Sequence, residues 1–301
     1  MSRAKISFLT VNYKQTDVTM ALVESLEQIT YPNWECIVVD NASENDELEK
    51  ALIGHERFKF IKSPENLGFA GGNNLGLDLC DGDYIFLINN DTEVPKDFLE
   101  PIIEFAEAQT NLGALSPKIR YFDKPDTIQY AGCTEMSKAS IRNSGIGDGE
   151  IDQGQYDKAY PVPFCHGAAL MVHRKVIEKV GLMRDDYFLY YEELDWCERI
   201  RQAGFQNWYF GKAHILHKES VSTGRNSPLK VYYLTRNRLL FARRNYPAGT
   251  RFINYLYYTF VALPKNLLSF GLKGEFKQAH AFWRAYIYNL THKASDSADR
   301  Y

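Results

Sequence analysis

The sequence predicts an α/β protein whose mainly parallel central sheet is flanked by helices and followed by a helical C-terminal region. Three observations lead to this fold class. Over the first hundred residues, short apolar runs alternate with segments of helical spacing. Polar clusters directly follow three of the apolar runs. From about residue 229 onward, the chain is helical in pattern, aromatic and basic.

The first hundred residues predict four strands, each followed by a helix. The run CIVVD at 36–40 is almost continuously apolar, as expected for a strand covered on both faces. Pro32 ends the first helix, and Pro95 lies near the first turn of the last one. This alternation predicts βαβ units and a parallel sheet. We expect strands at 6–11, 36–40, 58–61 and 84–88, and helices at 16–29, 45–53, 70–80 and 95–108.

The pattern changes after residue 113. Residues 113–165 contain short strand-like pieces, and the glycine-rich stretch at 144–149 predicts a loop. Further along we expect a strand at 167–172, helices at 174–180 and from Glu192 to just before Gly204, and strands at 207–210 and 213–217.

Composition narrows the class of protein. The 301 residues are 45% hydrophobic, which is enough for a packed core, and a net charge of −3 gives no reason to expect a nucleic-acid partner. The five cysteines are scattered without CxxC spacing, which favours buried thiols in a reducing compartment over disulfides or a zinc site. No apolar run resembles a signal peptide or a membrane span, so we expect a cytoplasmic protein.

Polar side chains gather where three predicted strands end. The clusters are 10–13 (TVNY), 40–43 (DNAS) and 89–92 (NNDT). In an open parallel sheet, ligands bind outside the carboxyl ends of the strands. Each cluster alone could be a turn. Together they favour a ligand site, in which Asp91 would help a metal ion to hold a phosphorylated ligand.

Residues 65–74 (ENLGFAGGNN) bring glycines to the start of a predicted helix. Glycine lets a ligand approach the backbone, and a helix N-terminus favours anions. The spacing is not that of a GxGxxG fingerprint, and a tight loop that opens a helix is an equal alternative.

Two further clusters carry titratable groups. Glu192, Glu193 and Asp195 stand at a predicted helix N-terminus, where they would complement the helix dipole or include a general base. In strict strand alternation, His214 and His217 point to opposite faces, so at most one of them binds a metal, and His217 at the strand end is the better candidate. His166 and His173 are expected to be structural.

Together these segments resemble the nucleotide-diphospho-sugar glycosyltransferases of the GT-A fold, family 2, and in particular bacterial rhamnosyltransferase-type enzymes. The resemblance spans roughly residues 5–240 and keeps the family order. Its segments are 11–13, 39–43, 66–74, 89–92, 192–195, and His217 with Ser220 and Ser222.

The resemblance implies a GT-A domain at 1–228 and a helical region at 229–301. Within the domain, 1–110 would be the nucleotide-binding half and 111–228 the acceptor and catalytic half. The implied activity is inverting, metal-dependent transfer of a hexose, with rhamnose as one option. The donor would be a UDP- or dTDP-sugar, and the acceptor a saccharide or lipid-linked saccharide in cell-surface polysaccharide synthesis.

The resemblance also implies donor-binding residues. The turn from Thr10 through Val11 and Asn12 to Tyr13, together with Asp40, would hold the nucleobase and ribose. Further donor contacts would come from Asn41, Asn66, Gly68, Gly71, Gly72, Asn73, Asn90 and Asp91.

Two positions depart from the family's motifs. Asp91 stands at the last position of the DxD signature, and Asn89 replaces its first Asp. Asp91 would bind Mg²⁺ or Mn²⁺, with His217 as a second ligand. Glu193 takes the place of the catalytic Asp, and Glu192 and Asp195 are alternatives for the base.

Three questions stay open from the sequence. The aromatic and basic helices after residue 229 could pack on the domain, form a homodimer, or contact the inner face of the membrane peripherally near a lipid-linked acceptor. Asn89 and Glu193 leave open a non-catalytic nucleotide-sugar-binding protein with a decayed site. A nucleotidyltransferase fits less well, because residues 11–14 (VNYK) lack a basic, glycine-rich signature.

Overall fold

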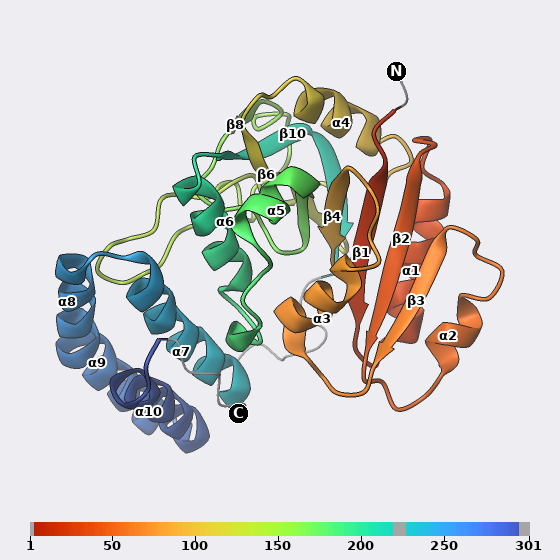
Figure 1. Ribbon diagram of the computed structural model, residues 1–301. Helices are drawn as coiled ribbons and strands as arrows, with labels where there is room; N and C mark the ends of the chain where they lie inside the picture. The colour runs from red at the N-terminus through yellow and green to blue at the C-terminus, as the bar shows by residue number, and fades with distance from the viewer. Residues whose placement is uncertain (1–2, 219–226, 295–301) are drawn as a thin grey trace.

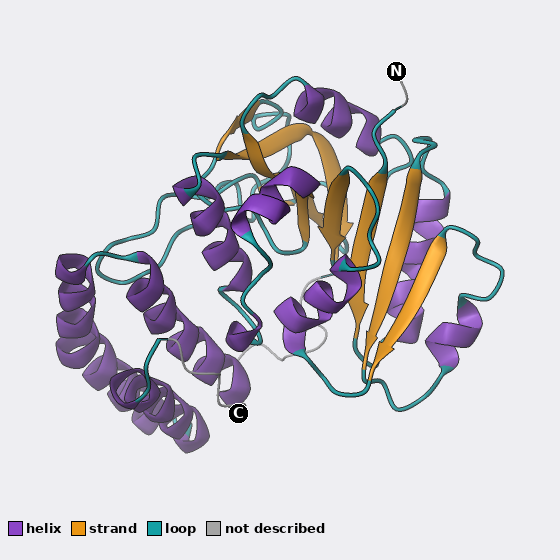
Figure 2. Ribbon diagram, viewed as in Figure 1, coloured by secondary structure: helices purple, strands orange, loops and turns teal. Residues whose placement is uncertain are grey.

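The computed structural model describes residues 3–218 and 227–294 of the chain, and it is built around a ten-stranded sheet in the order β3-β2-β1-β4-β9-β6-β10-β5 (Figures 1 and 2). Strands β7 and β8 pair with β6 and β10 beside this path. The predicted α/β class is therefore confirmed. Among the described residues, β1, β2, β3, β4, β6 and β10 run in one direction.

The first half of the sheet is parallel, as the βαβ pattern predicts. Its strands are β1 (Ile6–Asn12), β2 (Trp34–Asn41), β3 (Phe58–Ser63) and β4 (Tyr84–Ile88). Its helices are α1 (Thr16–Glu27), α2 (Glu47–Ala51), α3 (Gly68–Leu77) and α4 (Leu99–Glu107). All residues of β2 are buried, so helices and loops cover both sheet faces.

The second half of the sheet mixes strand directions. Strand β9 (Ala169–His173) is antiparallel to β4 and to β6 (Leu112–Tyr121), and β6 is parallel to β10 (Gln206–His217). The short strands are β5 (Thr92–Glu93), β7 (Ile128–Tyr130) and β8 (Ala159–Pro161). Strand β5 lies antiparallel to β10 at the far edge.

The strand pieces predicted at 207–210 and 213–217 are both strand, and the structure joins them in the single strand β10. The pairing with β6 shifts register between Phe210 and His214. A bulge at this place interrupts the apolar alternation, so one strand looks like two in the sequence. Gly211 lies in the bulge, where a Cβ would come within 1.8 Å of the Tyr156 carbonyl oxygen.

The remaining described helices all follow β9 in the chain (Figure 2). They are α5 (Arg174–Val180), the 3₁₀ turn η1 (Asp185–Tyr187), α6 (Glu192–Gln202), α7 (Pro228–Asn245), α8 (Ala248–Tyr257), the π-turn η2 (Tyr258–Ala262), α9 (Leu263–Leu272) and α10 (Phe276–Thr291). No described helix combines the length and the apolar character that a membrane span needs. All five cysteines are free and buried, as predicted.

Helix α3 packs very closely on β1 and β2 because glycines face the sheet. A Cβ on Gly76 would lie 2.3 Å from Leu9 Cδ1 and 2.8 Å from Val39 Cγ2. A Cβ on Gly72 would lie 2.9 Å from Val11 Cγ1. Side chains at these positions would push the helix away from the strand ends that carry the polar clusters.

Replacing Gly76 by alanine should destabilise the protein. The added methyl group overpacks the contact with Leu9 and Val39, at a cost of about 1–3 kcal/mol. Gly271→Ala in α9 is the matched control, because a Cβ there meets nothing within 4 Å. Thermal unfolding should show a lower Tm for Gly76→Ala and an unchanged or raised Tm for Gly271→Ala. Equal Tm values in the two variants would show that the close helix–sheet contact contributes nothing.

Candidate functional site

Asp91 and His217 meet where the turn after β4 reaches the β5–β10 pairing at the far edge of the sheet. His217 Nε2 lies 3.1 Å from Asp91 Oδ1, although the residues are far apart in the sequence. The contact follows from the β5–β10 pairing, which sets His217 opposite Thr92, and from the Lys218 N–H, which donates to the Asp91 carbonyl oxygen at 2.9 Å. The Thr92 N–H and hydroxyl both donate to the Asn89 carbonyl oxygen, which closes the turn that presents Asp91.

The two atoms that face each other here, an imidazole nitrogen and a carboxylate oxygen, are suitable ligands for a divalent cation. His217 Nδ1 lies 2.7 Å from Gln129 Oε1, and with the proton on Nδ1 this contact is a hydrogen bond that leaves Nε2 as the lone-pair nitrogen facing Asp91. Asp91 Oδ1 is buried and accepts no hydrogen bond from the described residues. Adjacent ligands of an octahedral Mg²⁺ at about 2.1 Å lie about 3 Å apart, which matches the observed 3.1 Å.

The protein offers only part of a coordination shell. Within residues 3–218 and 227–294, no group of three or more His, Cys, Asp or Glu side chains could hold a metal. A site with two protein ligands is typical of Mg²⁺ that is completed by water and substrate phosphates. Ser220 and Ser222, the other members of the His217 segment, lie outside the described residues.

Residues 166–168 lie between the Asp91–His217 pair and the N-terminal end of α6, where Glu193 is located. The ring of His166 lies 6.1 Å, centroid to centroid, from the ring of His217. A Cβ on Gly167 would lie 3.5 Å from Glu193 Cγ. The Ala168 carbonyl oxygen accepts from the Asn89 N–H at 3.0 Å. Three consecutive backbone positions therefore hold the Asp91 turn on one side and Glu193 on the other.

Glu192 and Glu193 begin α6 in a low-dielectric setting. Burial raises the pKa of Glu193 above its ordinary value. Burial, together with the charge of Glu193, raises the pKa of Glu192 well above the ordinary value. Glu192 is almost fully buried, and its Oε2 has no hydrogen-bond partner in the described structure, whereas Glu193 is half-buried. Glu193 is therefore the more accessible of the two carboxyl groups.

Asp195 has a different environment from its neighbours. Its side chain is fully buried, and Arg199 Nε and Arg184 Nη1 lie 2.9 and 3.1 Å from its oxygens. Tyr187 and Asn245 donate further hydrogen bonds to it. Both carboxylate oxygens are thus engaged in an ion-pair network, which gives Asp195 the surroundings of a structural anchor between η1, α6 and α7.

The backbone before α6 is strained and is held from α7. Phe188, Tyr190 and Tyr191 have φ of +63°, +69° and +76°, a left-handed conformation that is costly for side-chain-bearing residues. Asn237 Nδ2 lies within 2.9 Å of the carbonyl oxygens of Tyr187, Leu189 and Tyr190. The buried α7 side chain therefore fixes the segment that positions Glu192 and Glu193.

Arg236 strengthens the same attachment. Its Nη2 donates to the carbonyl oxygens of Asp186 and Tyr187, each at 2.8 Å. The Phe188 ring stacks on Tyr233, with centroids 5.2 Å apart. The C-terminal helices thus form part of the candidate site.

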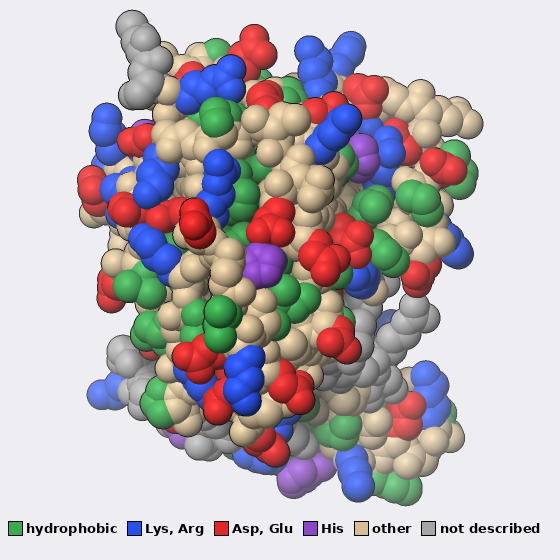
Figure 3. Space-filling view, turned by 90° about the vertical axis from the view of Figure 1, so that its right-hand side faces the viewer, with side chains coloured by type: hydrophobic (Ala, Val, Ile, Leu, Met, Phe, Trp, Pro, Cys, Tyr) green, Lys and Arg blue, Asp and Glu red, His purple; other side chains and the backbone are tan. Residues whose placement is uncertain are grey.

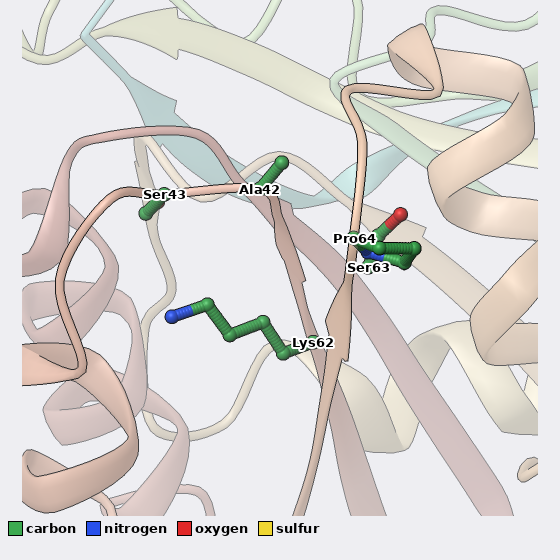
Figure 4. Close-up of a pocket in the computed structure, with 5 residues that line it drawn as sticks. All are labelled: Ala42, Ser43, Lys62, Ser63 and Pro64. Atoms are coloured by element: carbon green, nitrogen blue, oxygen red, sulfur yellow. The ribbon is translucent and has the colours of Figure 1, made fainter.

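The carboxyl ends of β1 and β2 form a second polar centre. Asn12 Nδ2 donates to Asp40 Oδ1 at 3.0 Å, and the Ser43 hydroxyl contacts the same oxygen. Beside them, a pocket of about 340 Å³ lies between the ends of β2 and β3, and Figure 4 shows its lining side chains. The lining residues are Ala42, Ser43, Lys62, Ser63 and Pro64.

Asn41 organises the loop before α3. Its Nδ2 donates to Asn66 Oδ1 and to the Gly68 carbonyl oxygen, and its Oδ1 accepts from the Leu67 N–H. Gly68 has φ of +71°, and a Cβ there would lie 2.2 Å from the Phe188 carbonyl oxygen. This glycine therefore allows the 66–68 loop to touch the strained segment before α6.

At the glycine-rich start of α3, two backbone N–H groups already donate to protein acceptors. The Gly68 and Phe69 N–H groups donate to Asn66 Oδ1 and to the Phe188 carbonyl oxygen. Gly71, Gly72 and Asn73 are buried; Gly72 packs on Val11 of β1, and a Cβ on Gly71 would lie 2.8 Å from Leu67 Cβ. For this segment the structure favours the tight-loop alternative over an anion cradle, because protein acceptors already occupy these N–H groups.

The remaining predicted donor residues surround the strand ends. Thr10 is fully buried, Val11 packs on α3, and Tyr13 is 40% exposed. Asn90 Nδ2 donates to the Thr19 hydroxyl at 3.0 Å, which ties the Asp91 turn to α1.

Three residues at the site were not among the sequence candidates. Gln129 orients His217, His166 lies beside it, and Asn237 fixes the strained backbone. Burial lowers the pKa of His166 to about 3, and the neighbouring His217 contributes in the same direction. His166 had been expected to be structural. For Asn237 the sequence shows only the polar run 235–238 (TRNR), a pattern that a solvent-exposed helix face would also have.

The sequence of this chain is similar to those of known glycosyltransferases. A sequence model described as glycosyl transferase family 2 matches residues 7–181, more than half of the chain. A low-salt glycan biosynthesis hexosyltransferase, Agl10, of Haloferax volcanii is 26% identical over 78% of this chain and 74% of its own. The dTDP-rhamnosyl transferase RfbF of Shigella flexneri is 24% identical over 79% of each chain.

Solved structures confirm the GT-A fold. A mannosyltransferase from Pyrobaculum calidifontis, in complex with GDP-Man and Mn²⁺, aligns with a TM-score of 0.60 at 15% identity. The alignment covers 97% of this chain and 88% of the other. GalNAc-T7 with UDP, GalNAc and Mn²⁺ aligns with a TM-score of 0.61 at 12% identity, over 86% of this chain and 56% of the other.

Replacing Asn237 by aspartate should loosen the backbone before α6. The change keeps the shape but removes both N–H donors and turns a negative charge toward three carbonyl oxygens. Hydrogen exchange measured by mass spectrometry should accelerate at least about tenfold over residues 186–193. Asn266→Asp is the matched control, because Asn266 bonds only within α9, to the Ala262 carbonyl oxygen. Unchanged exchange at 186–193 in Asn237→Asp would rule out the positioning role.

Proposed function

The chain belongs to glycosyl transferase family 2 and is a glycosyltransferase, and we propose that it is an inverting, metal-dependent enzyme that uses a UDP- or dTDP-sugar donor. The approach of Asp91 and His217 is the observation that carries this proposal, because the two facing ligand atoms suit a cation that binds a diphosphate. We further propose rhamnose as the first sugar to test.

The names of similar proteins support the choice of substrates. One relative transfers rhamnose from dTDP, as its name states, and the Mycobacterium tuberculosis relative is an N-acetylglucosaminyl-diphospho-decaprenol L-rhamnosyltransferase. The latter is 24% identical over 63% of this chain and 68% of its own. We therefore propose a saccharide on a lipid diphosphate as the acceptor, with a role in cell-surface polysaccharide synthesis at the cytoplasmic side of the membrane.

The donor would lie across the carboxyl ends of β1, β2 and β4. We propose that the pocket beside Asp40 and Ser43 holds the nucleobase and ribose (Figure 4). Asp91 and His217 would hold Mg²⁺ or Mn²⁺, which when bound neutralises charge on the departing diphosphate. Gln129 keeps His217 in the tautomer that binds metal.

Glu193 is the proposed general base. It would remove the proton from the acceptor hydroxyl as that oxygen attacks the anomeric carbon, and a single displacement inverts this carbon. Its pKa, raised by burial, brings the carboxylate closer to a base that works near neutral pH. Glu192 is more deeply buried and Asp195 is held in ion pairs, so both are less suited to receive the proton.

Replacing Glu193 by glutamine should lower the transfer rate about 10²–10⁴-fold and leave donor binding intact. The assay follows release of dTDP from dTDP-rhamnose with a GlcNAc-diphosphate lipid as acceptor. Glu198→Gln, one turn further along α6 and paired with Arg201, is the control and should keep the wild-type rate. Full activity in Glu193→Gln together with loss in Glu192→Gln would move the base to Glu192.

The pH dependence of the same reaction tests the environment of the base. The base must be ionised, so transfer should fall as the pH drops through its raised pKa. The acid limb of the pH–rate profile should therefore lie above the ordinary glutamate value of 4.5. A limb at or below that value would contradict the assignment of Glu193.

The metal assignment can be tested without turnover. Electron paramagnetic resonance should show Mn²⁺ binding that becomes much tighter when a nucleoside diphosphate is present, because the protein supplies two ligands. His217→Ala should weaken this binding at least about tenfold. His214→Ala should not, because His214 points to the other face of the same strand. Equal binding in both variants would exclude His217 as a ligand.

A decayed, non-catalytic site would give a different result in the binding and transfer assays described above. In that case nucleotide and metal would bind, and no sugar transfer would occur from any donor to any acceptor saccharide. Asn89 alone does not favour this alternative, because its backbone N–H and carbonyl groups build the turn that presents Asp91.

A further inference from the structure

Exposed apolar side chains concentrate on the C-terminal helices. Of the fifteen large hydrophobic residues exposed in the described structure, ten lie between Phe252 and Leu290. Leu272, Phe276 and Phe260 are 81%, 72% and 71% exposed. Such a concentration differs from the scattered exposed apolar residues that are normal on a soluble surface, and it marks an interaction site.

The spacing of these residues places them on the outer face of their helices. In α8 and η2, Phe252, Leu256 and Phe260 follow one another at four-residue intervals. In α10, Phe276, Trp283 and Leu290 follow at seven-residue intervals, which is two helical turns. These helices therefore carry apolar residues on the side turned away from the protein as well as on the side that packs against it.

The inner face of the same helices is anchored to the protein. Tyr258 is buried, and its hydroxyl donates to the Ser140 carbonyl oxygen at 3.0 Å. Asn254 donates to the carbonyl oxygen of Ala139 at 3.1 Å. On α10, the buried side chains of Phe282 and Tyr286 face inward. The outer residues are thus presented by a fixed support, which we call the α8–α10 surface (residues 248–291).

The α8–α10 surface is also basic. Residues 248–291 contain five Lys and Arg and one acidic residue, Glu275, although the whole chain has a net charge of −3. Lys265, Lys273 and Lys277 are exposed beside the apolar residues. The side of the molecule over α1 and α2 mixes acidic and basic side chains instead (Figure 3). In Figure 1 the helices α8 and α9 lie at the opposite end from α2 and β3.

We propose that the α8–α10 surface docks the protein on an anionic lipid bilayer, with its apolar side chains in the interface and its lysines at the headgroups. The positive charge of the α8–α10 surface favours a bilayer over a second copy of the chain as its partner. A two-fold dimer would place this basic surface against itself, and like charges would repel. An anionic bilayer matches both the apolar and the basic character.

Docking through α8–α10 would set the candidate site at a fixed position relative to the membrane. Helix α10 packs along α7, and α7 holds the backbone before Glu192 through Asn237. This consequence rests on the proposed function, because it supplies a lipid-linked acceptor to the base. The docking itself does not depend on any activity of the protein.

Vesicle flotation of the full chain tests the docking directly. The protein should float with vesicles rich in phosphatidylglycerol, float less with pure phosphatidylcholine, and lose binding as salt is raised. Leu272→Ser with Phe276→Ser should weaken binding on the order of tenfold or more, since both side chains are exposed and the fold should be unaffected. Lys273→Glu with Lys277→Glu should weaken it on the same order.

The flotation experiment has a matched control variant and two outcomes that would contradict the docking proposal. Ile53→Ser removes a side chain that is 78% exposed outside the α8–α10 surface, and it should leave flotation unchanged. Absence of flotation with anionic vesicles at low salt would overturn the proposal. So would a wild-type dimer in size-exclusion chromatography that becomes a monomer in Leu272→Ser with Phe276→Ser, without vesicle binding. Either result leaves the transferase assays unaffected, so the two proposals fail separately.

Discussion

The contact between Asp91 and His217 is the constraint on which the rest of the site depends. It requires β5 to pair with β10 across the end of the sheet, which fixes the turn after β4 against a strand that comes much later in the chain. In the same turn the Asn89 N–H donates to the Ala168 carbonyl oxygen, and the preceding residue of that segment, Gly167, lies against Glu193. The proposed cation site and the proposed base are therefore positioned by one connected stretch of backbone.

Strain in the backbone before α6 is balanced by hydrogen bonds from outside the sheet. Left-handed residues at Phe188, Tyr190 and Tyr191 persist because Asn237 and Arg236 bind the carbonyl groups of this segment. The helical C-terminal region is thus a structural part of the site. The outer face of this region is apolar and basic. The same helices therefore support the site and carry the surface that we propose to dock on the membrane, where the lipid-linked acceptor would lie.

The sequence predicted much of the architecture because the signals are local. Apolar runs and helical spacing identified the four parallel strands, and polar residues at their ends identified the edge that carries Asp40 and Asp91. Alternation along the last strand separated His217 from His214. The GT-A fold came from the family resemblance rather than from the patterns, and the solved structures confirm it.

Other features depend on contacts between distant residues, which no local pattern reveals. The insertion of antiparallel β9 between β4 and β6 brings His166 to the site, and nothing in its own segment indicates that pairing. The resemblance implies a donor contact for Gly72, which stays a prediction, and only the folded structure shows that Gly72 also packs on Val11 of β1. Asp195 resembled its acidic neighbours in the sequence, and only packing against Arg199 and Arg184 sets it apart.

Thermal unfolding with UDP, dTDP, GDP and ADP, each with and without Mn²⁺, tests the central claim most directly. A ligand that binds only the folded state raises the Tm by mass action. If Asp91 and His217 hold the cation, UDP or dTDP should raise the Tm only with Mn²⁺, and the rise should disappear in Asp91→Ala. A rise that is the same without Mn²⁺, or that persists in Asp91→Ala, would contradict the claim that Asp91 and His217 hold a cation against the diphosphate.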